Sequence, residues 1–472
     1  MTNYNRNWLP HLKDSIPLKA MGNDISMYAI ALEAWRRGLI VKFRHTYYKS
    51  ERRNRIKFTI GHKGKNHVFN VSRGDNVSKE AVRICIDKHQ TKEYLIKNNV
   101  PTPLGKDFDQ NISDEEIIQY ANTTGYPVVV KPVDGLSGKG VIVNIESKEQ
   151  LKAALDKVRR RLNHKRIIVE KHVNGEDCRV YIIDNEIIAA TKRVPAYIVG
   201  NGKNTIEDLI KMKNAERNSN PNYYGREINI NKKLIVDIEE KGYTMNTVLP
   251  KDQRLTLGTT NNISQGAEAF DITDEITDKI ESIAINAAKS IPELHQCSVD
   301  MLVDLDNDIA YVLEINSRPQ IGLHFFPSKG IARDVPKAII DYYFPETKDI
   351  PRNDSYYFNF DLYMKLLKSG GTKEIRLKKI RSYVPIKKKY TITLNDNHEQ
   401  FIRAVYKYAE KLRLDGHLSK KDEKSFSLVV GGSKSAMSEL NDLLKKSKHI
   451  THIIEEQWEK PIMMGFFIEN HQ

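Results

Sequence analysis

The chain has 472 residues, too many for one ordinary domain, and this length predicts two to four domains. Its 40% hydrophobic and 29% charged residues exclude a disordered chain, and its three widely spaced cysteines exclude a disulfide framework or a cysteine metal motif. We expect a cytoplasmic protein without a membrane span, because no apolar run is long enough to cross a bilayer and no secretory signal layout is present.

The first 85 residues predict an N-terminal α/β region. A helical pattern, MYAIALEAWRRG, is followed by three strand-like runs, LIVKF, RIKFTI and HVFNV. A helix is then expected to begin after Ser78, a good N-cap residue, and to end before Pro101.

The middle of the chain alternates between helical and strand patterns. The helix SDEEIIQYANTT, the strand YPVVVK, a glycine loop, the strand GVIVNI, the helix SKEQLKAALDKVRRRL and the strand RIIVEKHV predict a small α+β layer with antiparallel pairing. After them come the strands VYIID and EIIAATKRV, the helices TIEDLIKMKNAERN and DEITDKIESIAINAAKSI, and the hairpin SVDMLVDLDNDIAYVLEI. Residues 381–472 show a β-α-β-β-α-β pattern.

A basic segment separates the hairpin from that last pattern. Residues 363–390 hold ten Lys or Arg and one Glu, out of a net charge of +14 for the whole chain. Two interpretations stay open: a solvated basic connector, or a patch for an acidic partner. No nucleic-acid-binding module is recognisable, which argues against a nucleic-acid partner.

The stretch KPVDGLSGKG, residues 131–140, is a candidate phosphate loop. It matches neither the Walker pattern nor the dinucleotide pattern, because the glycine spacing is wrong for both. What it predicts is a strand ending in Lys131, a flexible glycine turn and a second strand. Such a hairpin is either a plain turn or a flap that closes over nucleotide phosphates, with backbone N–H groups and lysine binding the oxygens.

A second cluster lies in the hairpin SVDMLVDLDNDIAYVLEI. A turn centred on Asn307 places Asp300 opposite Glu314, and Asn316 on the same face as Glu314. Two adjacent carboxylates beside an amide oxygen repel one another unless a cation lies between them. Oxygen ligands of this kind suit Mg²⁺ rather than zinc.

With the glycine loop, the strand VEKHV and the EIN hairpin in this order, the chain resembles the ATP-grasp superfamily. Over residues 86–346, the stretches ERNSNPNYYGRE, LGTTNNISQGAEAFDITDEI and VLEINSRPQIGLHFFPSKGIARDVPKAIIDYYFP are similar to the ATP-grasp module of cyanophycin synthetase, and the last is also similar to bifunctional glutathione synthetase. The resemblance implies two α+β subdomains that clasp ATP, and ATP-driven, ADP-forming ligation of a carboxylate to an amine or another nucleophile.

The resemblance also implies roles for individual residues at the nucleotide. Lys88, with Lys92 as its alternative, and Lys131 match the two phosphate-binding lysines. The glycine loop implies further phosphate contacts at Gly135, Ser137, Gly138 and Gly140. Glu170 and Val173 match the adenine positions, and Asp177, with Glu176 as its alternative, matches the ribose position.

At the reacting end, Arg179 and Arg193 match basic positions that face the transferred phosphoryl group, although each alone also fits a surface salt bridge. The turn NNISQGA matches an Asn-x-Ser-x-Gly turn beside the acceptor site, at Asn262, Ser264 and Gly266. The implied metal ligands are Asp300, Glu314 and Asn316, which would hold Mg²⁺, as two ions, with Mn²⁺ as a substitute.

The chain departs from its relatives where the substrate end is shaped. After EIN comes Ser-Arg-Pro-Gln at residues 317–320, so the substrate cannot be inherited from the resemblance. The Mur-ligase-like half of cyanophycin synthetase and the glutamate–cysteine ligase module are both absent. We therefore do not expect this chain alone to make cyanophycin or complete glutathione.

Residues 381–472 resemble acylphosphatase, a ferredoxin-like fold. The match rests on the helix YAEKLRLDGHL, the strand SFSLVVGG and the helix after it. Aligning the first helix puts Ile402 where acylphosphatases carry an arginine and Lys420 where they carry an asparagine, with Arg403 one position off. A structural, dimerising or substrate-presenting module is therefore expected rather than an active hydrolase.

The sequence thus predicts an α+β protein with an ATP-grasp fold. The expected segments are an N-terminal α/β region, the ATP-grasp domain, a basic connector and the acylphosphatase-like domain: 1–85, 86–346, 347–380 and 381–472. The predicted function is an ATP- and Mg²⁺-dependent carboxylate–amine ligase that acts through an acyl phosphate on an amino acid or peptide, with a homodimer as the assembly considered. The alternatives are an acyl-phosphate hydrolase, or a polyanion-binding protein with a vestigial nucleotide site.

Overall fold

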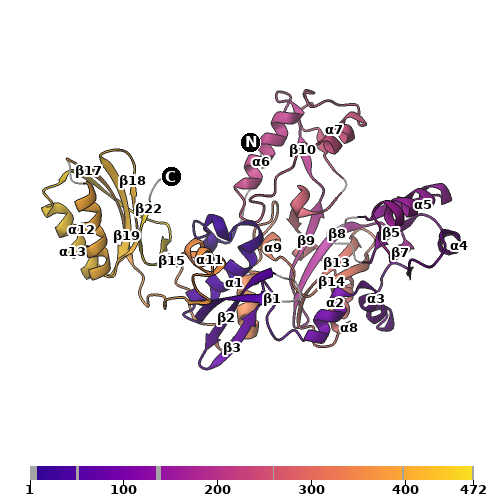
Figure 1. Cartoon of the computed structure of the whole chain (residues 1–472), viewed down its shortest axis with the longest axis horizontal. Coiled ribbons are helices and arrows are strands. Elements are labelled where there is room, and N and C mark those ends of the chain that lie inside the picture. The colour runs from indigo at the N-terminus through magenta and orange to yellow at the C-terminus, as the bar shows by residue number, and fades with distance from the viewer. Residues whose placement is uncertain (1–7, 49–52, 134–139, 259, 396–397, 470–472) are drawn as a thin grey trace. The chain divides into compact units, whose positions relative to one another are not determined.

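The computed structural model describes residues 8–48, 53–133, 140–258, 260–395 and 398–469 (Figure 1). The chain divides into two compact units, of which the first is residues 1–8 with 71–342 and the second is residues 9–70 with 343–472. Among the residues described, no helix has both the length and the apolar character needed to cross a bilayer.

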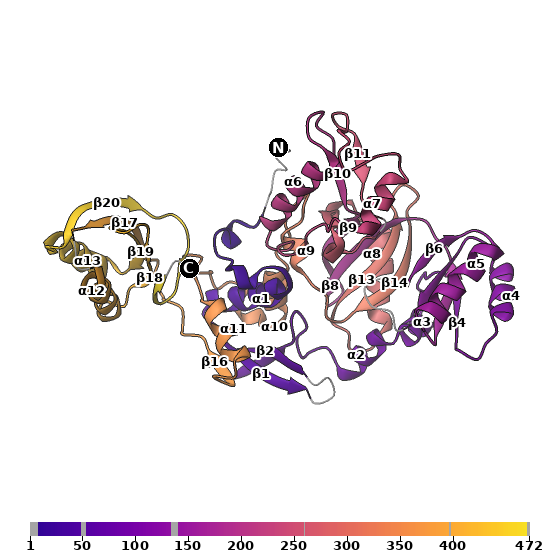
Figure 2. The ribbon, with the colours of Figure 1, turned by 45° about the horizontal axis from the view of Figure 1, so that its top comes forward.

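The first unit contains a four-stranded antiparallel sheet in the order β4-β7-β5-β6. Its strands are β4 (Gly105–Phe108), β5 (Val128–Pro132), β6 (Ile142–Ile145) and β7 (Ile167–Lys171). Two helices, α4 (Asp114–Thr124) and α5 (Lys148–Leu155, continued by a π-helical turn over Asp156–Arg161), bury their apolar side chains against one face of this sheet (Figure 2). Because side chains alternate along a strand, the other face carries the residues between them.

A second sheet of the first unit has five antiparallel strands in the order β12-β9-β8-β13-β14. They are β8 (Glu176–Ile183), β9 (Glu186–Val194), β12 (Glu268–Asp271), β13 (Gln296–Asp304) and β14 (Ile309–Asn316). One face packs on three helices, α2 (Lys79–Ile86), α3 (Lys88–Lys97) and α8 (Asp278–Ser290). The opposite face is rich in charged side chains.

The helix predicted to follow Ser78 is in fact two helices, so the prediction of one continuous helix was wrong. Ser78 does cap α2, because its side chain accepts a hydrogen bond from the Ala81 N–H. Asp87 then adopts an extended conformation, and its carboxylate accepts from the N–H groups of His89 and Gln90. This second N-cap starts α3 in a new direction.

Residues 196–257 of the first unit form a small core of their own. The strands β10 (Tyr197–Val199) and β11 (Arg254–Thr256) pair with each other, and the helices α6 (Ile206–Asn218) and α7 (Lys232–Glu239) pack beside them. The short helix α9 (Gly322–Phe325) and the helix α10 (Val335–Tyr343) follow the second sheet.

In the second unit, the early residues and residues after 347 form one structure. The helix α1 (Ile25–Arg36) is followed by the strands β1 (Ile40–Tyr48), β2 (Arg53–His62) and β3 (Lys65–Phe69). Residues predicted to be a connector supply β15 (Tyr356–Tyr357), α11 (Phe360–Lys368) and β16 (Glu374–Arg376), and β16 pairs with β1 in the sheet order β16-β1-β2-β3. The segment 347–380, predicted as a basic connector, thus also supplies buried apolar residues to this core, among them Phe358, Phe360 and Leu367.

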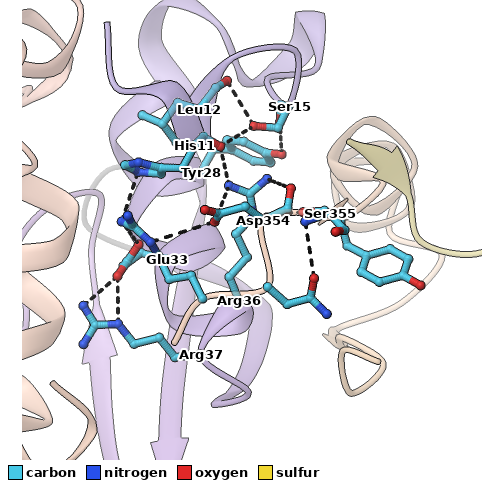
Figure 3. Close-up of polar contacts among 12 residues, drawn as sticks. His11, Leu12, Ser15, Tyr28, Glu33, Arg36, Arg37, Asp354 and Ser355 are labelled. Carbon is cyan, nitrogen blue, oxygen red and sulfur yellow. Dashed lines mark hydrogen bonds and ion pairs between the residues drawn. The ribbon is translucent and has the colours of Figure 1, made fainter. Parts of the chain in front are cut away.

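A buried arginine joins these distant segments (Figure 3). Arg36, 1% exposed, donates from Nε to the Tyr356 carbonyl at 2.8 Å and from Nη1 to the His11 carbonyl at 2.5 Å, and its guanidinium lies 3.5 Å from Asp354. A buried guanidinium without partners is very unfavourable, so these contacts hold α1 to the later segment.

The C-terminal part of the second unit has the predicted β-α-β-β-α-β order of elements. They are β17 (Ile386–Leu394), α12 (His398–Lys411), β18 (Asp415–Lys420), β19 (Ser425–Gly432), α13 (Lys434–Lys446) and β20 (Ile450–Gln457), followed by β21 (Ile462–Met463) and β22 (Phe466–Glu469). The sheet order is β20-β17-β19-β18-β22, and both helices contribute to one core with it (Figure 1). On β17, Lys389 pairs with Glu456 at 2.8 Å, so this end of the basic segment meets acidic side chains.

We predict that Phe358→Ala destabilises the protein by about 3–5 kcal/mol, because the ring is buried and contacts Tyr28, Trp35 and Phe43. Urea unfolding checks this value. The matched control is Leu362→Ala on α11, whose side chain is exposed and whose loss should change the free energy of unfolding little. Equal effects of the two substitutions would contradict the description of this segment as core.

Candidate active site

Two lysines converge on one buried carboxylate at the first sheet. Lys131 on β5 and Glu170 on β7 point away from α4 and α5, and Lys131 Nζ lies 2.5 Å from Glu170 Oε1. Lys92 on α3 places its Nζ 3.2 Å from Glu170 Oε2. Of the two candidate lysines on α3, it is therefore Lys92 that meets Glu170, while Lys88 lies one turn earlier at the first position of the helix.

The electrostatics of this cluster favour an anion. Glu170 is 4% exposed, and one carboxylate faces two ammonium groups. Burial lowers the pKa of Lys92, with Lys131 acting in the same direction and Glu170 opposing them. A phosphate oxygen placed beside both lysines would reduce their mutual repulsion.

The close approach of β4 to Glu170 requires glycine. Gly105 is the cross-strand partner of Glu170, and a Cβ at this position would lie 2.3 Å from the Glu170 Cβ. The missing side chain lets β4 pair at full register while the Glu170 carboxylate turns toward the lysines.

On the charged face of the second sheet, Arg179 and Asp300 are cross-strand partners in a bidentate ion pair. Arg179 Nε lies 2.7 Å from Asp300 Oδ1, and Arg179 Nη2 lies 2.7 Å from Asp300 Oδ2. Arg193 on β9 contacts Asp300 Oδ2 at 3.1 Å and Asp177 Oδ1 at 2.9 Å. Four charged side chains from three strands thus form one connected network.

Burial shapes the charge of both aspartates in this network. Burial alone would raise the pKa of Asp300, which is 3% exposed, but Arg179 and Arg193 outweigh it and hold that pKa well below its usual range. For Asp177, burial raises the pKa, and the charge of Asp300 adds to this while Arg193 opposes it. Asp300 is therefore ionised throughout the neutral range.

The hairpin register predicted for the acidic cluster is confirmed. Asp300 pairs with Glu314 and Ser298 pairs with Asn316, and the register shifts only after Asp300. Asn316 Nδ2 donates to Glu314 Oε1 at 3.0 Å, so these two side chains share a face and touch.

This set of oxygens fits Mg²⁺. Asp300, Glu314 and Asn316 offer two carboxylates and an amide oxygen on adjacent strands, which is the ligand type that Mg²⁺ prefers. A carboxylate has about four acceptor positions, and Asp300 uses three of its own for the arginines. Asp300 can therefore keep its ion pairs and still hold a cation.

Of the remaining nucleotide residues predicted from the sequence, Val173 and Gly140 lie next to strands of the two sheets. Val173 is half-buried in the segment 172–175, which connects β7 of the first sheet to β8 of the second. Gly140, with φ 79°, precedes β6. Three predicted loop residues fall outside the described residues: Gly135, Ser137 and Gly138.

The predicted acceptor turn is a 3₁₀ turn over Ile263–Gln265. The Asn262 side chain accepts from the Ser264 N–H at 3.0 Å and from Ser264 Oγ at 2.8 Å, and Gly266 has a left-handed φ of 99°. The neighbouring Asn261 donates to Asp177 Oδ2 at 3.1 Å, which brings the start of this turn to the charged network.

A buried arginine that sequence reasoning missed holds this turn in place. Arg217 on α6 donates to the carbonyls of Ile263, Gly266 and Ala267 at 2.8–3.1 Å, and to that of Arg226. Nothing in the sequence distinguishes it from the other basic residues of α6, because its partners are backbone groups far along the chain.

The segment of residues 317–320, which was predicted to shape the substrate end, is also held by distant residues. Ser72 Oγ donates to the Pro319 carbonyl at 2.5 Å, and Arg73 Nη1 lies 3.1 Å from Ser317 Oγ. Gln296 on β13 donates to the Ser72 carbonyl at 2.8 Å. The segment before α2 thus positions the residues that follow β14, a relation with no signal in the sequence.

His324 on α9, beside the charged face of the second sheet, is another residue to which the sequence did not point. It is fully buried, and its ring centroid lies 5.9 Å from that of Tyr181 on β8. Burial lowers the pKa of His324 to about 3, and the charge of Arg179 acts in the same direction. The imidazole is therefore neutral at physiological pH.

We predict that His324 makes the protein less stable as the pH falls below about 6.5. The unfolded state takes up the proton near pH 6.5 while the folded state resists it until about pH 3, so acid favours unfolding. Between pH 7.5 and 5.5 the loss attributable to this residue is about 1 kcal/mol in the free energy of unfolding. Urea unfolding of His324→Leu at both pH values should show a correspondingly smaller loss than the wild type, and an unchanged loss would contradict the prediction.

Comparisons with known proteins find similarity over part of the chain. Residues 102–213 match the family profile described as D-ala D-ala ligase C-terminus. Cyanophycin synthetase of Trichormus variabilis is 35% identical over 274 residues, which is 56% of this chain and 30% of that protein. A glutathione biosynthesis bifunctional protein of Clostridium perfringens is 30% identical over 273 residues, 55% of this chain and 34% of that protein.

The chain therefore spans about a third of the length of the curated relatives that it matches. Among solved structures, a bifunctional glutathione synthetase from Pasteurella multocida is similar to 61% of this chain and 40% of its own, with a TM-score of 0.48 and 23% identity.

Proposed function

We propose, from the ATP-grasp domain that this chain carries, that the protein is an ATP- and Mg²⁺-dependent carboxylate–amine ligase acting on an amino acid or peptide. The observation that carries the proposal is the position of α3. Its Leu95 packs in the core of the second sheet, while Lys92, one turn away, contacts Glu170 of the first sheet. One helix thus ties the lysine cluster to the sheet that carries the acidic cluster.

The proposed chemistry begins with a carboxylate, which is a poor acylating agent because its leaving group would be oxide. Transfer of the γ-phosphoryl group of ATP to this carboxylate gives an acyl phosphate and ADP. An amine then attacks the acyl carbon, loses a proton, and releases inorganic phosphate as the amide bond forms. Both steps bring anionic groups together, so catalysis depends on positioned positive charge.

The residues of this chain divide that task. Lys92 and Lys131 bind phosphate oxygens, and Lys88 lies on the same helix. Mg²⁺ held by Asp300, Glu314 and Asn316 would supply further charge neutralisation to the phosphates. Arg179 and Arg193 keep Asp300 ionised and oriented, and their remaining N–H groups face the same side of the sheet.

At the other end of the site, the turn presents the half-buried Asn262 and the exposed Ser264, and the neighbouring Asn261 contacts Asp177. We assign this turn to the acceptor. Glu170, Val173 and Asp177, at and after the strand that leads from one sheet to the other, are assigned to the adenosine part of ATP.

We predict that Lys131→Ala or Glu314→Ala lowers substrate-dependent ADP release at least about a hundredfold, because Lys131 neutralises phosphate charge directly and Glu314 is a proposed ligand of the Mg²⁺ that does so. The coupled assay runs with Mg²⁺, ATP and a panel of amino acids and dipeptides, and the product mass identifies the substrates. Lys152→Ala, an exposed lysine on α5, is the matched control and should keep the wild-type rate. Wild-type rates in the site variants would contradict the assignment.

The second candidate function is that of an acyl-phosphate hydrolase, because the C-terminal part contains a pocket of about 540 Å³. Its lining includes Ile402 and Lys420, the two positions where the resemblance to acylphosphatase expects arginine and asparagine. The neighbouring Arg403 is directed to Glu399, 3.3 Å away. Among the described residues that line this pocket, none supplies the guanidinium or the amide that would bind an acyl phosphate and orient water.

We expect no phosphate release from benzoyl phosphate above the buffer rate when ATP is absent. An active acylphosphatase serves as the positive control in the same assay. Turnover that disappears in Lys420→Ala would instead establish a hydrolytic site in this pocket. The homodimer and the cytoplasmic location stay predictions.

A further inference from the structure

The two units differ sharply in charge. The first unit contains 38 Lys or Arg and 40 Asp or Glu, a net of −2, whereas the second contains 37 and 21, a net of +16. The whole basic excess of the chain therefore lies in the unit that does not contain the candidate active site. The ligase chemistry proposed above gives no reason for this asymmetry.

Strand alternation places part of this charge on one face of the sheet β16-β1-β2-β3. Lys42 and Arg44 of β1 share that face. Across the ladder, Arg44 pairs with Lys57 of β2, and Lys42 pairs with Arg376 of β16. Arg55, two residues from Lys57, belongs to the same face. These five residues are called the basic face.

The opposite face of the same sheet is the core of this part of the second unit. Phe43 and Phe58, which alternate with the basic residues, are fully buried, and Phe43 contacts Phe360 of α11. The basic face is thus the solvent side: Arg44 and Arg376 are exposed, and the Lys42 side chain is 39% exposed. Among the described residues of these strands, Glu374 is the acidic residue on this face, and it lies 3.5 Å from Lys42.

The geometry of the face limits what it can bind. Lys42 and Arg44 are about 6.8 Å apart along β1, the repeat at which an extended polypeptide presents side chains to one side. Where side chains of this face are described, the other residues are small polar or aliphatic, such as Thr59 and Val68. Carboxylates pair well with arginine, and three arginines belong to the basic face: Arg44, Arg55 and Arg376.

We propose that the basic face binds an acidic polypeptide in an extended conformation. Carboxylates on alternate residues of the ligand meet the cations of β1 and its neighbouring strands, and aliphatic parts of the ligand lie against Val68 and Ile40, each 41% exposed. This binding uses no residue of the ATP site and needs no nucleotide, so it stands apart from the ligase proposal.

The test uses the full chain without ATP. A fluorescein-labelled peptide of ten glutamates is titrated by fluorescence anisotropy at 50 mM and 300 mM NaCl, and we expect binding that weakens as salt screens the charges. The double variant Arg44→Ser/Arg376→Ser should bind about tenfold more weakly at the lower salt concentration, since each exposed pair contributes modestly. Arg44→Lys/Arg376→Lys, which keeps the charge, should retain most of the binding.

The control variant Lys407→Ser/Lys424→Ser removes the same charge from exposed positions elsewhere in the second unit and should bind within about twofold of the wild type. An equal loss in this control would overturn the proposal, because the binding would then be a property of net charge alone. Tighter binding of a labelled ten-nucleotide single strand than of the peptide would overturn it in favour of nucleic acid. Absence of peptide binding at 50 mM NaCl, with melting temperatures unchanged, would also overturn it.

Discussion

The ion pair between Arg179 and Asp300 is the interaction around which the candidate site is built. The two residues are direct neighbours across β8 and β13, so the ladder that pairs these strands also sets the 2.7 Å contacts between their side chains. The same alternation that sends Val180 and Val299 into the core sends these charges to the opposite face. A shift of one residue in the register would bury the charges and expose the core.

A buried charge network of this kind requires that every member keep a partner. Asp300 serves Arg179 and Arg193, and Asp177 in turn binds Arg193 and Asn261. The lysine cluster follows the same rule, because the single carboxylate of Glu170 is the partner of both Lys92 and Lys131. Asp300 still has an acceptor position for a cation, and the lysine cluster has a net positive charge that attracts an anion. A nucleotide bound to Mg²⁺ supplies both the cation and the anion.

Much of this site could be predicted from short-range patterns. The acidic hairpin is one example, because the tight turn at Asn307 fixes which residues face each other. Lys131 and Glu170 could be placed on strands, but their contact with Lys92 could not, since it depends on how α3 crosses between the sheets after Asp87. Arg217 and Ser72 act on backbone carbonyls that lie tens to hundreds of residues away, and a backbone carbonyl looks the same in every sequence.

The sequence by itself determined the β-α-β-β-α-β order of residues 381–472, the strand that carries Lys131 and the acidic hairpin, because each depends on residues close together in the chain. Only the tertiary structure decided that β16 (Glu374–Arg376) joins the sheet of β1, and that Lys92 rather than Lys88 meets Glu170. It also decided that Lys42, Arg44, Lys57 and Arg376 share one exposed face. Those outcomes depend on pairing between distant strands, whose free energy comes from burying apolar surface that no local pattern specifies.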